Sequence, residues 1–108
     1  MTRNISLVLS ILAAASIALG VHLASADEQF DVTAGKGEIT LTTKGHWHVN
    51  KEYPWRVVAG DKTIDKSKFS LTETSAKITG LPQGAAKLKG AVCDGPQCMP
   101  FAKDITVP

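Results

Sequence analysis

The sequence predicts an all-β protein, an immunoglobulin-like antiparallel sandwich of about seven short strands preceded by a helical signal peptide. Short segments that alternate polar and apolar residues follow one another after residue 26, and turn-forming Gly, Pro and Asp residues separate them. No segment of that region keeps a helical period over several turns. A series of short strands with frequent turns favours a sandwich of the immunoglobulin type.

The first 26 residues carry the pattern of a secretory signal peptide. Arg3 supplies a weakly basic start, residues 5–21 are apolar, and the small residues 24–26 form a cleavage signal. The residue directly after the predicted cut is Asp27 and not a cysteine, so the thiol needed for a lipoprotein anchor is missing there. We predict cleavage after Ala26, a periplasmic or secreted protein, and no stable membrane association after cleavage. An uncleaved anchor is the alternative, because the apolar stretch approaches the length of a short membrane span.

Length and charge restrict what the remaining chain can be. Removal of the first 26 of 108 residues leaves 82, which predicts one small domain over residues 27–108. The whole chain has 12 Lys and Arg against 10 Asp and Glu, and loss of Arg3 brings these numbers closer still. A nearly balanced charge lacks the basic surface of a nucleic-acid-binding protein. We therefore expect no nucleic-acid partner, and no motif indicates a cofactor.

The strands are expected in the following order. The first runs over residues 38–42, and Trp47 and Val49 continue its apolar face. The turn formers that separate the later strands lie at residues 60–61, 81–84 and 94–96. The further expected strands are 55–59, 68–72, 76–79, 85–93 and 103–107.

The two cysteines of the chain, Cys93 and Cys98, flank the last of these turns. Export to an oxidising compartment predicts a disulfide between them. A ring of six residues stabilises by only about 2 kcal/mol, whereas a bridge across some sixty residues would give roughly 4 kcal/mol. The spacing therefore makes this pair a poor choice of staple, but most cysteine pairs in small secreted domains are structural, so the residues alone still favour a structural disulfide over one that reacts.

Strand alternation predicts the direction of both cysteine side chains. Cys93 shares a face with Lys87 and Lys89, and counting back by twos from Asp104 places Cys98 among the exposed residues. We expect both sulfurs to face water, where a partner thiolate can reach them. The two lysines are expected to favour the thiolate after reduction.

Two regions resemble a known family. Residues 45–54, Gly-His-Trp-His-Val-Asn-Lys-Glu-Tyr-Pro, resemble the G-[YW]-H-[VI]-N…P segment of domains like the amino-terminal periplasmic domain of the thiol:disulfide interchange protein DsbD, with His46 as an extra residue. Residues 89–93 and 98–100 look like that family's late strand pair, in which two nearby cysteines lie across a hairpin. Together the resemblance covers about residues 35–107.

This resemblance implies an immunoglobulin-like thiol-disulfide interchange domain. Such a domain receives electrons on its cysteine pair from a membrane partner and passes them to periplasmic oxidoreductases. By position, Cys93 and Cys98 would be the redox pair, and periplasmic or membrane thiol oxidoreductases would be the partners. The best-known members shield the cysteines with an aromatic and acidic cap loop, for which residues 61–67 offer no equivalent.

The same residues suggest other functions. His46 and His48 lie two apart on one expected strand and could bind copper together with Met99. A secreted binding or structural module with a purely structural disulfide is the main alternative to exchange. No charged pair suggests general acid and base catalysis, and no serine lies in a nucleophile motif.

The aromatic residues Trp47, Tyr53 and Trp55 could form a recognition surface. Large aromatic side chains in so small a sandwich are more often part of the core. We therefore expect them in the core, with Tyr53 as the most exposed of the three.

Overall fold

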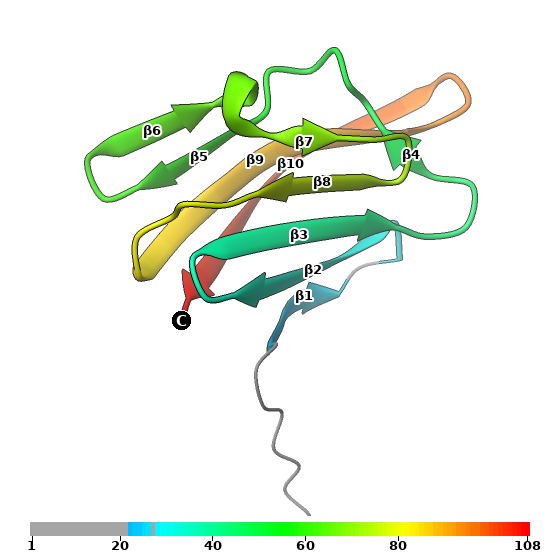
Figure 1. Ribbon diagram of the computed structural model, residues 1–108. Coiled ribbons are helices and arrows are strands. Elements are labelled where there is room, and N and C mark those ends of the chain that lie inside the picture. Colours follow the sequence, from blue (N-terminus) through cyan, green and yellow to red (C-terminus); the bar gives the residue numbers. More distant parts are fainter. Residues whose placement is uncertain (1–21, 27) are drawn as a thin grey trace, which may run out of the picture.

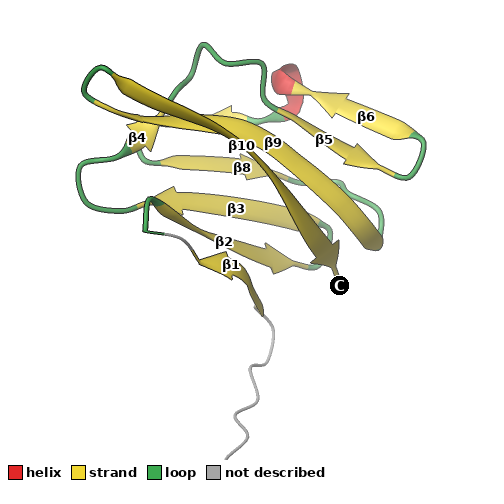
Figure 2. Cartoon of the chain, turned by 180° about the vertical axis from the view of Figure 1, so that it is seen from behind, coloured by secondary structure: helices red, strands yellow, loops and turns green. Residues whose placement is uncertain are grey.

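The computed structural model describes residues 22–26 and 28–108, which form a sandwich of two antiparallel sheets (Figures 1 and 2). The first sheet has the order β1-β2-β3-β8-β7, with strands β1 (His22–Ala26), β2 (Phe30–Gly35), β3 (Glu38–Thr43), β8 (Ser75–Ile78) and β7 (Ser70–Leu71). The second has the order β10-β9-β5-β6, with strands β10 (Gln97–Val107), β9 (Gly84–Asp94), β5 (Arg56–Ala59) and β6 (Lys62–Asp65). A short strand β4 (His48–Val49) also pairs with β9, and a 3-10 turn, η1 (Lys66–Lys68), joins β6 to β7.

The strand order is that of an immunoglobulin-like fold. Apart from β1, the first sheet runs β2-β3-β8-β7, which in chain order corresponds to the A-B-E-D sheet of immunoglobulin domains. The second sheet runs β10-β9-β5-β6, which corresponds to strands G, F, C and C′. The predicted fold class is therefore confirmed.

The core lies between the two sheets and is apolar throughout. No polar or charged residue is buried among the described residues. Alternation in β2 and β3 places every second side chain in this core, which is why these short segments adopt strands with one buried face. The largest fully buried side chains are Trp55, Phe30, Ile39, Leu41, Ile78 and Leu88.

The observed strands differ from the expected ones in several places. Strands β1, β2 and β6 were not predicted and β4 is separate from β3, so the described part of the chain has ten strands instead of about seven. The expected continuation of the first strand through Trp47 and Val49 is wrong, because β3 ends at Thr43 and the chain crosses to the other sheet. Gly45 makes this crossing with a φ of 60°, a left-handed conformation that glycine adopts without a Cβ clash.

The predicted signal peptide overlaps the described structure. Its last five residues form β1, an edge strand paired with β2. The predicted helical and apolar part, residues 5–21, lies outside the described residues. Within the described residues, no helix has the length and apolar character needed to cross a membrane.

A loop interrupts the strand that corresponds to strand C. Val49 pairs with Val92, and the N–H of Asn50 donates to the carbonyl of Ala91. The next paired residue is Arg56, opposite Lys89. Residues 51–55 therefore form a loop at the position where a regular ladder would have placed a partner for Gly90.

Trp55 fills the space that this loop leaves. Its side chain is fully buried, and its indole N–H donates to the carbonyl of Asn50 at 2.8 Å. A Cβ atom on Gly90 would lie 2.3 Å from the Trp55 ring. The ring also packs against Phe69 and Phe101, with centroid distances of 5.9 and 5.7 Å. The absence of a side chain at Gly90 is therefore what lets Trp55 lie against the sheet.

Candidate functional site

The candidate site lies at the tip of the β9–β10 hairpin. Asp94 pairs with Gln97, and Gly95 has a φ of 61° at the first central position, as in two-residue type II′ turns. The register then places Cys98 directly opposite Cys93, and the predicted disulfide joins them. Their Cα atoms are 4.0 Å apart, below the range usual for disulfides, because the two residues face each other directly across the ladder. This close spacing does not mark the pair as redox active.

The two cysteines differ in exposure. Cys98 is exposed, in agreement with the count by twos along β10, whereas Cys93 is only 5% exposed. The expectation that both sulfurs face water is therefore wrong for Cys93. Its face was predicted correctly, because Val92 before it is fully buried in the core between the sheets and Cys93 points the other way.

Its neighbours explain why an outward-facing Cys93 is buried. β9 is a central strand here, with His48 of β4 opposite Cys93 on one side and Cys98 of β10 on the other. One step along the same face, Ala91 is 1% exposed between Asn50 and Pro100. Small side chains on a central strand are covered by larger side chains from both flanking strands.

The sheet edge makes one of the two sulfurs the better target. Attack on a disulfide requires approach to one sulfur, with the other as leaving group. In-line attack on the Cys98 sulfur comes from the side opposite its bond to Cys93. On that side of β10 no described strand pairs. The corresponding approach to Cys93 meets β4 and His48. The fold therefore exposes Cys98 to attack and covers Cys93.

His48 is the site residue that the sequence did not link to the cysteines. Directly opposed residues of antiparallel strands have Cβ atoms about 4.5–5.5 Å apart, so His48, Cys93 and Cys98 form one row across three strands. Only the pairing of β4 with β9 places this histidine there, since 45 residues of sequence separate it from Cys93.

The lysines expected to favour the thiolate lie farther away. Four residues separate Lys89 from Cys93 along β9, which is roughly 13 Å at about 3.3 Å per residue. That distance exceeds the Debye length of about 8 Å at physiological ionic strength, and Lys87 lies farther still. Lys87 also forms an ion pair with Asp104 at 3.2 Å. We therefore assign the lysines no role at the bridge.

The residues considered as an alternative copper site, in place of the expected absence of a metal, do not come together. His48 lies on the outer face of its sheet, whereas Met99, opposite Val92, packs against the core on the inner face. His46 is exposed in the crossing between β3 and β4. In the disulfide form, the described residues contain no group of three His, Cys, Asp or Glu side chains able to hold a metal ion.

The aromatic residues follow the expectation of a core role to different degrees. Trp55 is fully buried, while Trp47 and Tyr53 are partly buried and pack against the core. Segment 61–67, which has no sequence equivalent of the cap loop, forms β6 and the start of η1. β6 pairs with β5 and not with β9, so this segment does not lie over the bridge.

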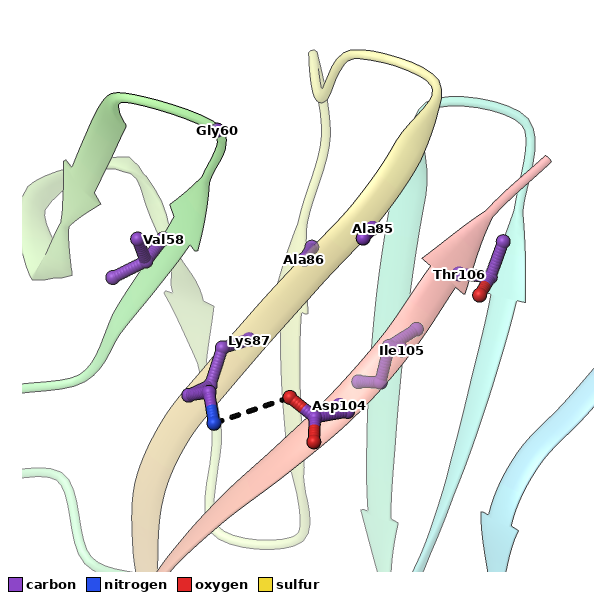
Figure 3. A pocket seen from close by; sticks show the side chains of 8 residues that line it. All are labelled: Val58, Gly60, Ala85, Ala86, Lys87, Asp104, Ile105 and Thr106. Atoms are coloured by element: carbon purple, nitrogen blue, oxygen red, sulfur yellow. Dashed lines mark ion pairs between the residues drawn. The ribbon is translucent and has the colours of Figure 1, made fainter.

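Two other features lie away from the bridge. A shallow hollow at the opposite end of the hairpin is lined by Val58 and by the ion pair of Lys87 with Asp104, among other residues (Figure 3). Its two charged side chains pair with each other and leave no free acid or base. At η1, hydrogen bonds from the hydroxyl and backbone N–H of Ser67 lower the pKa of Asp65.

Comparison of the chain with family models, with curated proteins and with solved structures gives no match. The site is therefore interpreted from its own geometry.

Proposed function

We propose that the chain is a thiol-disulfide exchange domain of the periplasm or another oxidising compartment outside the cytoplasm. Its Cys93–Cys98 pair would alternate between disulfide and dithiol while the sandwich holds Cys98 at an exposed edge. The observation that carries this proposal is the position of Cys98 on β10, with solvent on the side opposite its bond to Cys93. The resemblance of the cysteine hairpin to DsbD-like domains supports the same role.

The exchange balances in two steps. A thiolate of a dithiol partner attacks the Cys98 sulfur, forms a mixed disulfide, and releases Cys93 as a thiolate. The second thiolate of the partner then attacks the partner's sulfur in the mixed disulfide. This step forms the partner's disulfide and releases Cys98 as a thiolate. Two electrons reach this chain, and the partner becomes a disulfide. The reverse sequence passes the electrons on to an oxidised oxidoreductase.

The proposal also includes export. The signal-peptide pattern and the disulfide both favour an oxidising compartment. Cleavage after Ala26 would remove β1 and leave β2 as the edge of its sheet. The mass of the exported protein tests this step, because a mature chain that begins at Asp27 is expected.

A redox titration in glutathione buffers tests the exchange function. We expect a midpoint potential above about −300 mV, within reach of thiol oxidoreductases. Labelling of free thiols after acid quenching measures the reduced fraction at each potential. A midpoint well below about −300 mV would mark a structural bond and contradict the proposal.

The second candidate is a secreted binding or structural module whose bridge only holds the hairpin. The 5% exposure of Cys93 favours it, because half of the bond is protected from attack. Reactivity of single-cysteine variants separates the two candidates. In Cys93→Ser the remaining Cys98 thiol should react with 5,5′-dithiobis(2-nitrobenzoate) about tenfold or more faster than the Cys93 thiol in Cys98→Ser, because access limits the reaction. Equal, slow reaction of both thiols would favour the structural module.

A further inference from the structure

The row of His48, Cys93 and Cys98 brings one imidazole and two sulfur atoms to the same face of β4, β9 and β10. The register places His48 and Cys98 on either side of Cys93, so all three side chains leave the sheet in the same direction. His48 is partly buried, and its ring has no hydrogen bond or ion pair to the described residues. Reduction of the bridge would therefore leave three metal-binding side chains next to one another.

We propose that the reduced form of this row binds one Cu⁺ ion through the two thiolates and the imidazole of His48. A dithiol reductant supplies two electrons and two protons to the bridge and becomes a disulfide itself. Binding of the ion then displaces the two thiol protons to solvent, because the thiolate is the metal ligand. The disulfide form lacks these thiolates and does not bind the ion.

The donor set selects the metal. Thiolates are soft ligands that prefer Cu⁺, Zn²⁺ or iron–sulfur clusters, and imidazole suits copper and zinc. Structural zinc sites almost always have four protein ligands, but this row provides three. The next row on the same face contains Ala91 and Pro100, which have no side-chain donor atom. Zn²⁺ on a Cys₂His set needs a water as its fourth ligand, whereas Cu⁺ is satisfied by three soft ligands, so Cu⁺ fits the row better.

Asn50 lies in the next row, where its backbone N–H donates to the carbonyl of Ala91. Its side-chain oxygen already accepts a hydrogen bond from the backbone N–H of Glu52 at 3.0 Å. The alternative copper set considered from the sequence combines His48 with His46 and Met99. Strand pairing replaces both of those residues with cysteines, because Met99 faces the core and His46 lies in the crossing loop.

This site is independent of the proposed exchange function. Binding requires only that the bridge can be reduced, and a chemical reductant supplies that step in the experiment. A low midpoint potential in glutathione would contradict exchange and leave the metal site unaffected.

The test is an anaerobic titration of the protein with Cu⁺ in competition with bicinchoninate. Protein reduced with tris(2-carboxyethyl)phosphine should bind one equivalent, and the disulfide form should bind none. His48→Ala should weaken binding by roughly tenfold or more, since even loss of an outer partner of a metal ligand costs 10–100-fold. His46→Ala is the matched control and should bind as the wild type does. Cys93→Ser combined with Cys98→Ser should abolish binding.

Several outcomes would overturn the proposal. One is equal affinity of the wild type and His48→Ala, each shown by circular dichroism to keep its sheet spectrum. Another is loss of the sheet spectrum on reduction, because the row exists only in the paired sheet. X-ray absorption of the loaded wild type should show two sulfur neighbours and one nitrogen neighbour. A shell of sulfur alone, or tighter binding of Zn²⁺ in the same competition, would contradict the assigned ligands or the metal.

Discussion

The two halves of the β9–β10 hairpin differ in how their outer faces meet solvent. In the proximal half, residues 84–89 and 102–107, exposed Lys87 alternates with buried Leu88. In the distal half, residues 90–101, four consecutive residues of β9 are buried on both faces, from Gly90 to Cys93. β9 thus has an open outer face at one end and a covered one at the other.

The neighbouring strand and the size of the side chains explain this difference. The proximal half of β9 carries long lysines that reach past their neighbours on β5 and β10 into water. The distal half carries Ala91 and Cys93, which are too short to rise above the side chains of β4 and β10. Alternation therefore predicts the direction of a side chain, and its size relative to its cross-strand neighbours decides whether it is exposed.

The largest expected effect is at Gly90, where the two halves meet. Gly90→Ala should lower the free energy of unfolding by about 1–3 kcal/mol, because the new Cβ would overlap the Trp55 ring and force it to move. Gly35→Ala is the matched control, since its Cβ would meet only the flexible side chain of Glu38 at 3.4 Å. Urea unfolding of both variants measures the difference. Equal stability of the two variants would mean that Trp55 does not depend on Gly90.

Removal of the bridge should sharpen the contrast between the halves. The double variant Cys93→Ala, Cys98→Ala should lose about 2 kcal/mol of stability, as expected for a ring of this length. Hydrogen exchange should accelerate at the amides of residues 91–101 and change less at residues 84–88, because the loop near the bridge opens locally. Uniform acceleration along the hairpin would show that the bridge stabilises the whole sandwich and not only the distal half.

The proximal ion pair should matter much less. Lys87 and Asp104 are 3.2 Å apart, but their side chains are 46% and 84% exposed. A double-mutant cycle with Lys87→Ala and Asp104→Ala should give a coupling energy under about 1 kcal/mol that declines with added salt. A larger, salt-independent coupling would show that this half also depends on a specific polar contact.

The smallest effect is expected outside the hairpin, at Asp65. The hydrogen bonds of Ser67 lower the Asp65 pKa below its ordinary value of 3.8, so the folded state favours the carboxylate. Its stabilising contribution is present above that value and is lost as the pH falls through the lowered pKa. Unfolding of the wild type and Asp65→Asn should therefore differ at neutral pH and converge in acid. A constant difference across this range would rule out the carboxylate as the cause.

The sequence by itself determined the fold class, the disulfide and the face of each cysteine. Period-two alternation depends only on the geometry of an extended strand, so the segments that became β3, β5, β8 and β9 could be recognised locally. The turn at Gly95 likewise depends on adjacent residues. Strands β2 and β6 were not predicted from the sequence, although β2 alternates buried and partly buried residues throughout.

Only the tertiary structure decided the exposure of Cys93 and the position of His48 beside it. Both depend on the pairing of β4 with β9, which joins segments far apart in the sequence. The loop of residues 51–55 and the fit of Trp55 over Gly90 lie next to that pairing, and neither leaves a local pattern. Cross-strand neighbours are set by register over long sequence separations, so the chemistry of the row at the bridge could not be predicted before the sheets were assembled.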